Sequence, residues 1–197
     1  MSYRLKLIIT ISLLIAITFS LGGTLLINAS FSNALEAETA SALDAFRSVL
    51  STLQLLNSMG GQTGYGDLTE ALSGMEGRMG RWQAISLTTG GSVIYQSRSE
   101  LLGDVALPVL SPERCSYVRV SDDYGQGLLA LSTIVAEDRK LTLQARFDLS
   151  AVYSSREAQQ RRFVTAYVIV VILGIAVATV LSFTLTVAFT ASPTLRD

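Results

Sequence analysis

The sequence predicts an α+β protein in which two membrane-spanning helices flank one domain built on an antiparallel five-stranded sheet. Three observations lead to this expectation. Two long stretches carry no charge, an apolar stripe at helical spacing follows the first, and five central segments alternate between apolar and polar residues. Of the 197 residues, 49% are hydrophobic and 16% are charged, and the mean hydropathy is +0.43. Soluble domains usually carry about a quarter charged residues, so this composition indicates a membrane protein.

The first uncharged stretch follows residues 1–6 and runs from Leu7 to Ile27. At 1.5 Å per residue it is about 32 Å long, which is enough to cross the hydrocarbon core of a bilayer. The apolar region of a secretory signal peptide is shorter, about 7–15 residues. We therefore expect an uncleaved span over residues 7–27, with a secreted precursor whose signal is cleaved as the alternative.

The second uncharged stretch begins at Phe163 and extends to Leu195. Residues 163–189 are expected to span the membrane, and residues 190–197 to begin a cytoplasmic linker. The excess length indicates a tilted helix or a segment that emerges on the far side.

Basic residues near the first span set the expected orientation. Arg4 and Lys6 precede it, and no further Lys or Arg occurs before Arg47. The positive-inside rule then places the N-terminus in the cytoplasm. Residues 28–162 follow as one extracytoplasmic domain, and the C-terminus is cytoplasmic.

Both spans carry small residues at intervals of four, which lets helices approach closely in lipid. The residues are Ser12, Ala16, Ser20 and Thr24 in the first span, and Gly174, Ala178 and Ser182 in the second. The stripes indicate helix contact, either within one chain or in a homodimer with a four-helix bundle.

The outer domain is expected to begin with a long helix, because residues 28–59 contain neither Gly nor Pro. A glycine-rich loop should end it, and a short helix should follow over residues 67–79, capped by Asp67. The stripe of the long helix consists of Leu35, Thr39, Ala42, Phe46, Val49, Leu53 and Leu56.

Five strands are then expected, because the period of the pattern changes to two. They cover residues 81–88, 92–97, 115–122, 128–135 and 141–147. The first two form a hairpin around Gly90 and Gly91. Residues 98–114 form an irregular connection of the length typical of a functional lid. A last helix begins at Asp148 and runs directly into the second span.

The composition excludes several kinds of chemistry within this chain. Histidine is absent, which excludes a Ser-His-Asp triad, a His-based zinc site and a phosphoacceptor histidine. The single cysteine, Cys115, excludes an internal disulfide and is expected to be an inert free thiol. Neither Gly60-Gly61 nor Gly90-Gly91 has the context of a phosphate-binding loop. A net charge of −1 does not favour a nucleic-acid partner. No catalysis, cofactor or metal is expected.

The order of elements resembles the sensory half of bacterial two-component sensor histidine kinases with a Cache-type, PAS-like extracytoplasmic domain. The residues that carry the resemblance run from Leu141 to Tyr153, LTLQARFDLSAVY, as a last strand followed by the start of a helix. The tail from Thr190 to Asp197 is similar to the opening of a HAMP linker. The chain ends where a HAMP helix would begin, and the family's histidine-bearing helix and ATP-binding domain are missing from it. It is therefore expected to be either a fragment or a truncated sensor that lacks its output.

The resemblance implies a two-pass protein of the bacterial plasma membrane that senses an extracytoplasmic stimulus and relays it through both spans. Its implied partners are membrane lipid, a second copy, an unknown ligand and, through the missing kinase domain, a response regulator. As this chain alone it would not be an enzyme. The alternatives are the input module of a chemoreceptor or cyclic-dinucleotide enzyme, and a non-signalling membrane adaptor.

The resemblance also implies where a ligand would bind, because in such domains one sheet face packs on the long helix and the other lines a pocket. We expect the polar face to present Tyr117, Arg119 and Arg146, with Trp82 and Tyr95 on neighbouring strands. Arginine can clamp a carboxylate with two hydrogen bonds, and aromatic rings can enclose an apolar ligand. The alternative is solvent-exposed arginines on an open face and aromatic rings in the core.

Three residues are candidates for relaying the signal, namely Asp148, Tyr153 and Pro193. The acidic pairs Asp122-Asp123 and Glu137-Asp138 stand at hairpin turns. Acidic turns of this kind are usually solvated, although carboxylates also suit a divalent cation.

Overall fold

The computed structural model describes residues 3–59, 65–76, 81–103, 115–136 and 139–190. The chain forms two compact units. The first comprises Met1–Ser32 and Ser154–Asp197, and the second comprises Asn33–Tyr153. The second unit lies within the range 28–162 expected for the outer domain.

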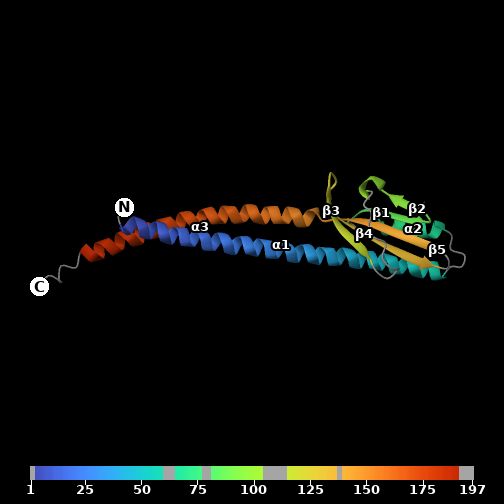
Figure 1. Cartoon of the computed structure of the whole chain (residues 1–197), viewed down its shortest axis with the longest axis horizontal. Coiled ribbons are helices and arrows are strands. Elements are labelled where there is room, and N and C mark those ends of the chain that lie inside the picture. Colours follow the sequence, from blue (N-terminus) through green and yellow to red (C-terminus); the bar gives the residue numbers. More distant parts are fainter. Residues whose placement is uncertain (1–2, 60–64, 77–80, 104–114, 137–138, 191–197) are drawn as a thin grey trace. The chain divides into compact units, whose positions relative to one another are not determined.

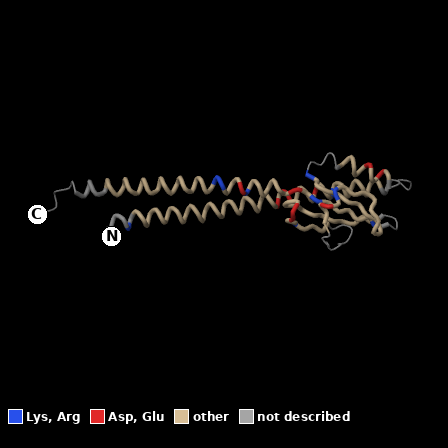
Figure 2. Tube along the Cα trace, turned by 90° about the horizontal axis from the view of Figure 1, so that it is seen from above, with Lys and Arg blue, Asp and Glu red and all other residues tan. Residues whose placement is uncertain are grey.

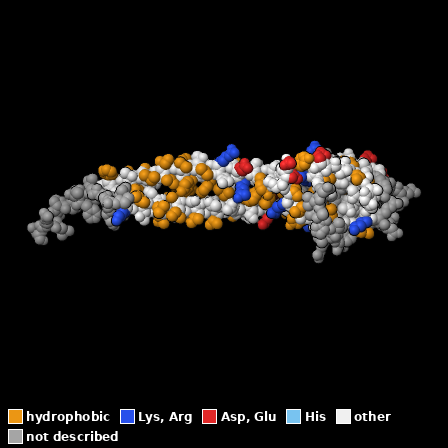
Figure 3. Space-filling view, turned by 45° about the horizontal axis from the view of Figure 1, so that its top comes forward, with side chains coloured by type: hydrophobic (Ala, Val, Ile, Leu, Met, Phe, Trp, Pro, Cys, Tyr) orange, Lys and Arg blue, Asp and Glu red, His pale blue; other side chains and the backbone are white. Residues whose placement is uncertain are grey.

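The first unit consists of two long helices that lie side by side (Figures 1 and 2). They belong to α1 (Tyr3–Met59) and α3 (Ser150–Thr190). Both helices are long and apolar enough to cross a membrane. Figure 3 shows hydrophobic side chains along much of this helix pair. The expected continuity of each apolar stretch with a helix of the outer domain is confirmed, since α1 and α3 are unbroken.

Aromatic rings pack between the two helices of this unit. Phe19 of α1 stacks on Phe163 and Tyr167 of α3, with ring centroids 5.6 Å and 6.2 Å away. The Phe163 ring fills the space beside Gly23, where a Cβ atom would overlap it. Closer to the second unit in sequence, the Arg156 guanidinium lies 4.4 Å from the centroid of Phe31. An alanine at position 23 would therefore force the Phe163 ring to move.

The second unit is built on one antiparallel sheet with strand order β2-β1-β5-β4-β3 (Figure 1). The strands are β1 (Trp82–Thr89), β2 (Ser92–Ser97), β3 (Ser116–Asp122), β4 (Gly125–Ala136) and β5 (Arg139–Asp148). All five expected strands are present. The two longest extend further than expected, because β4 and β5 pair from Gly127 to Ala136 without interruption.

Helix α1 covers one face of the sheet, which we call the helix face. Its stripe is buried from Leu35 to Leu53, as expected. Phe46 is fully buried and contacts Phe147 of β5 edge-on, with ring centroids 6.4 Å apart. Other buried side chains of the helix face are Leu87, Leu128, Leu143 and Ala145. This face forms the main apolar core of the unit.

The opposite face, which we call the far face, carries a smaller apolar cluster. Ala84 and Leu129 lie on it beside Arg146, because all three occupy paired positions of adjacent strands. Leu102 packs against both, and it follows a short 3-10 turn, η1 (Ser99–Leu101). The structure describes the segment expected to be a lid only as far as residue 103. Leu102 is the residue of this segment that packs on the cluster.

The short helix α2 (Tyr65–Glu76) begins two residues earlier than expected. Asp67 therefore lies in its first turn and not at the cap. Leu68 and Leu72 of α2 are buried. The helix contacts β2.

Candidate functional site

One hollow of the second unit combines aromatic walls with charged groups, and we call it the Trp82 pocket. Its volume is about 200 Å³. It is lined by Glu38, Ser41, Ala42 and Ala45 of α1, and by Arg81, Trp82, Phe147 and Asp148 of the sheet. Trp82 and Phe147 are register partners, which brings the start of β1 beside the end of β5. Their ring centroids are 4.6 Å apart.

The charged groups of the Trp82 pocket stand in defined pairs. Arg81 forms an ion pair with Glu38, whose side chain is only 21% exposed. The backbone N–H of Asp148 donates to the carbonyl oxygen of Arg81 at 3.0 Å. The Asp148 carboxylate accepts a hydrogen bond from the backbone N–H of Ser150 at 2.8 Å and so caps the first turn of α3. The residues that line the pocket thus include two acids and one arginine.

Glu38 and Arg81 were not recognised as site residues from the sequence. One feature of the sequence could have identified Glu38. Glu38, Ser41 and Ala45 recur at helical spacing and lie beside the Leu35 stripe on the helix surface. Nothing in the local pattern indicates which strand this second stripe faces.

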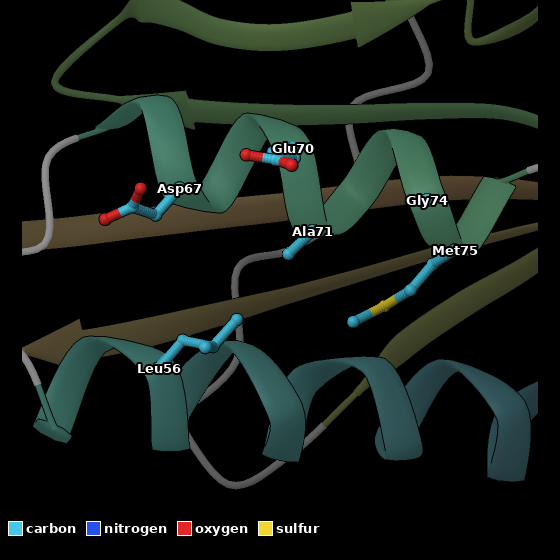
Figure 4. Close-up of a pocket in the computed structure, with 6 residues that line it drawn as sticks. All are labelled: Leu56, Asp67, Glu70, Ala71, Gly74 and Met75. Atoms are coloured by element: carbon cyan, nitrogen blue, oxygen red, sulfur yellow. The ribbon is translucent and has the colours of Figure 1, made fainter.

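A second hollow lies between the end of α1 and α2 (Figure 4). Leu56 of α1 and Met75 of α2 point into the space between the helices, and Ala71 lies beside them. Asp67 and Glu70 add carboxylates on the α2 side. The volume is about 410 Å³, but the hollow is wide open to solvent.

A third hollow lies in the first unit and is almost wholly apolar, with a volume of about 370 Å³. Ile11 and Ile15 of α1 face Leu173, Gly174 and Ala178 of α3 across it. A Cβ added at Gly174 would lie 3.6 Å from the Ile15 side chain. One of the small residues spaced four apart in the second uncharged stretch therefore contacts α1.

Arg146 was expected on a polar face open to a ligand, but its guanidinium is fully used within the fold. The side chain is 2% exposed on the far face. Asp122 accepts two of its hydrogen bonds, at 2.6 Å and 2.7 Å, in a bidentate pair. Gln83, the Leu101 carbonyl and the Gly125 carbonyl accept the others. Each of the five N–H donors of the guanidinium therefore has an acceptor.

The Arg146 cluster also determines the charge state of Asp122. Hydrogen bonding from Arg146 lowers the pKa of the Asp122 carboxyl below its usual value of 3.8, against an opposing effect of desolvation. The Tyr124 ring centroid lies 6.0 Å from the guanidinium carbon. Within the acidic pair Asp122-Asp123, Asp122 is thus the ion-pair partner of Arg146. Glu137-Asp138 lies outside the described residues.

The expectation that Tyr117, Arg119 and Arg146 share one face is wrong. Arg119 pairs with Leu128 and Tyr117 pairs with Ala130, which places both on the helix face. The Arg119 guanidinium donates to the hydroxyl of Thr39 on α1 at 3.3 Å. Arg146 lies on the opposite side, because side chains alternate along each strand.

The aromatic candidates also lie on the helix face. Tyr95 pairs with Leu87 and is partly buried. Trp82 is partly buried against Phe46 and Phe147. Of the five ligand-binding candidates, Trp82 lines a hollow whose described lining also includes charged residues. The binding of a ligand by these residues stays a prediction.

The relay candidates have different positions. Asp148 lines the Trp82 pocket and caps α3, and Tyr153 is partly buried in the first turn of that helix. Pro193 lies outside the described residues. Cys115 is partly exposed, and burial raises the pKa of its thiol. Within the described ranges, His, Cys, Asp and Glu side chains form no group of three suited to a metal ion.

Comparison with known proteins adds no relative, since no family model, curated protein or solved structure matches the chain.

Proposed function

We propose that the chain is the signal-input half of a two-pass bacterial membrane sensor, with the Asn33–Tyr153 unit outside the cell. A stimulus at this unit would be relayed through α1 and α3 to a cytoplasmic histidine-kinase output. The chain itself carries out no catalysis and acts as a homodimer. Both termini are cytoplasmic in this proposal.

The observation that supports the proposal most is the direct connection of both apolar helices to the core of the sensor unit. Helix α1 carries the buried stripe from Leu35 to Leu53 as part of the same unbroken helix. Helix α3 begins two residues after β5 ends. A change in the sheet can therefore reach both helices without a flexible linker.

Backbone hydrogen bonds fix the start of α3 to the sheet. The N–H of Leu149 donates to the carbonyl oxygen of Gln126 at 2.9 Å, and the N–H of Asp148 donates to that of Arg81. The side chain of Leu149 is 1% exposed. A relay needs two conformations that bind the stimulus with different affinity, and these hydrogen bonds connect the first residues of α3 to any change in the sheet.

The experiment is a chimera in which this chain is fused, through residue 190, to the HAMP linker and kinase of a sensor with a reporter-gene output. Gly23 and Gly22 form a matched pair, because a Cβ at Gly23 would overlap Phe163 whereas a Cβ at Gly22 meets nothing within 4 Å. Gly23→Ala is expected to shift the basal output severalfold, and Gly22→Ala to leave it unchanged. Phe46→Ala, which disturbs the sensor core, should also shift the output.

Equal output from all three variants and from the parent chimera would contradict the proposal. Orientation is checked separately in a Cys115→Ser background. A cysteine at the exposed Glu100 should react with an impermeant maleimide added to intact cells, and a cysteine at Ser2 only after lysis. The reverse labelling would exclude an extracytoplasmic sensor.

A further inference from the structure

The Trp82 pocket has the size and chemistry of a binding site for a small cation. Its volume of about 200 Å³ is smaller than the roughly 300–1,000 Å³ of pockets for drug-sized ligands. The ligand must therefore be small. Most of its lining is apolar, with polar groups at a few positions, as in pockets that orient a bound molecule.

The aromatic wall of the pocket favours a positive charge. Trp82 and Phe147 both line it, and Phe46 lies behind them with its ring centroid 6.4 Å from each. The face of an aromatic ring is electron-rich and attracts ammonium groups within about 6 Å, most strongly in the case of tryptophan.

The charges that line the pocket are complementary to a cation. Glu38 and Asp148 are acidic residues of the lining, and Arg81 is a basic one. Arg81 is 65% exposed whereas Glu38 is 21% exposed, so the acid is the more deeply placed partner of their ion pair. A partly desolvated carboxylate interacts more strongly with an added cation than a solvated one does.

We propose that the Trp82 pocket binds a small organic cation, an amine or quaternary ammonium compound, between the Trp82 ring and the Glu38 carboxylate, with Asp148 as a further acidic residue of the lining. The cation competes with the Arg81 guanidinium for Glu38. It contacts α1 through Glu38 and Ala42, and it contacts the residue that caps α3 through Asp148. The claim that this ligand controls signalling rests on the proposed function, whereas the claim that the pocket binds it does not.

Trp82 is the only tryptophan in the chain, so its fluorescence reports on the pocket directly. The full chain in lipid nanodiscs is titrated with choline, and in parallel with the neutral alcohol in which carbon replaces the ammonium nitrogen (dimethylbutanol). Sodium chloride keeps the ionic strength constant, because salt screens charge interactions. We expect a saturable change with choline and affinity about tenfold lower for the alcohol, which corresponds to about 1.4 kcal/mol.

Two variants separate a binding role from a structural one. Glu38→Gln is expected to weaken choline binding about tenfold and to leave binding of the alcohol unchanged. Arg81→Gln breaks the same ion pair but removes the competing cation, so it is expected to strengthen choline binding. Glu36→Gln is the matched control, since Glu36 is an exposed acid of α1 that does not line the pocket.

The proposal is overturned if choline causes no saturable change at concentrations where millimolar binding would saturate, or if the alcohol binds as tightly as choline. It is also overturned if Arg81→Gln weakens choline binding as Glu38→Gln does, because the ion pair would then merely support the fold. A positive titration together with an unresponsive chimera would retain the binding site and reject the signalling role.

Discussion

The two faces of the sheet are stabilised by different physical interactions. The helix face is covered by α1 and consists of apolar side chains such as Phe46, Leu87 and Phe147. The far face has a smaller apolar cluster and depends on the Arg146 guanidinium, which joins β5 to β1, η1 and the β3–β4 turn. Burial of apolar surface is non-directional and tolerates gradual change, whereas a hydrogen-bond network requires each partner in its place.

The largest expected effect comes from the helix face. Phe46→Ala should destabilise the second unit by about 3–5 kcal/mol, because it removes a fully buried ring from contact with Trp82 and Phe147. The measurement is denaturant unfolding of the full chain in detergent, followed by Trp82 fluorescence. Phe46→Leu should recover most of the loss. A loss below about 1 kcal/mol in Phe46→Ala would show that this face is not the main core.

Arg146→Met should cost about 2–3 kcal/mol, because it leaves several acceptors without their donor while the partly exposed Asp122 carboxylate gains access to water. Arg146→Lys should be almost as unstable, since an ammonium group cannot reproduce the planar fork. The same unfolding measurement applies. If Arg146→Lys were as stable as the parent chain, the planar guanidinium would not be needed for the network.

The matched control for this pair is Arg47→Met. Arg47 is also an arginine paired with an aspartate, Asp44, but both side chains are more than 60% exposed. Its loss should change the stability by no more than about 0.5 kcal/mol.

The far face should also be the acid-sensitive one. The pKa of Asp122 is lower in the folded than in the unfolded chain, so the Asp122–Arg146 pair contributes stability at neutral pH. This contribution declines as the pH falls below about 5 and is lost once the pH passes through the folded-state pKa. Unfolding curves at a series of pH values should show a smaller decline for Asp122→Asn than for the parent chain. Asp67→Asn, at an exposed position, is the control, and equal declines in all three proteins would refute the linkage.

Among the changes within the two sheet faces, the smallest effect should come from the arginine on the helix face. Arg119→Met removes one 3.3 Å hydrogen bond to Thr39 from a side chain that is otherwise exposed. A cost of about 0.5–1 kcal/mol is expected in the same unfolding measurement. A cost equal to that of Arg146→Met would mean that the two faces do not differ in this respect.

The elements of the fold follow from the sequence, because each depends on neighbouring residues. The Leu35–Leu53 stripe and the Gly90-Gly91 hairpin are local patterns, and both are present as expected. The alternation within each strand also identifies its two faces. It does not indicate which face of one strand aligns with which face of another, and this is why Arg119 and Arg146 were assigned to the same side.

The Arg146 cluster depends on contacts between residues far apart in the chain, and local sequence patterns do not encode such contacts. Arg146 meets Gln83 and Leu101 only because β5 pairs with β1 and the segment after β2 folds back over the far face. The turn there begins at Arg98, which has a positive φ of 48° although it is not glycine. Such a backbone conformation is uncommon for arginine, so the sequence gives no local indication of it.

The strand order has a consequence for biosynthesis. The last strand in the sequence, β5, is the central strand, and it pairs with both β1 and β4. The apolar stripe of α1 therefore lacks most of its covering sheet until residue 148 has been synthesised. At about 5–20 residues per second, the ribosome needs roughly 5–20 s to extend the chain from the end of α1 to the end of β5. During that interval the apolar stripe stays without most of its partner strands, and exposed apolar surface of this kind is prone to aggregation.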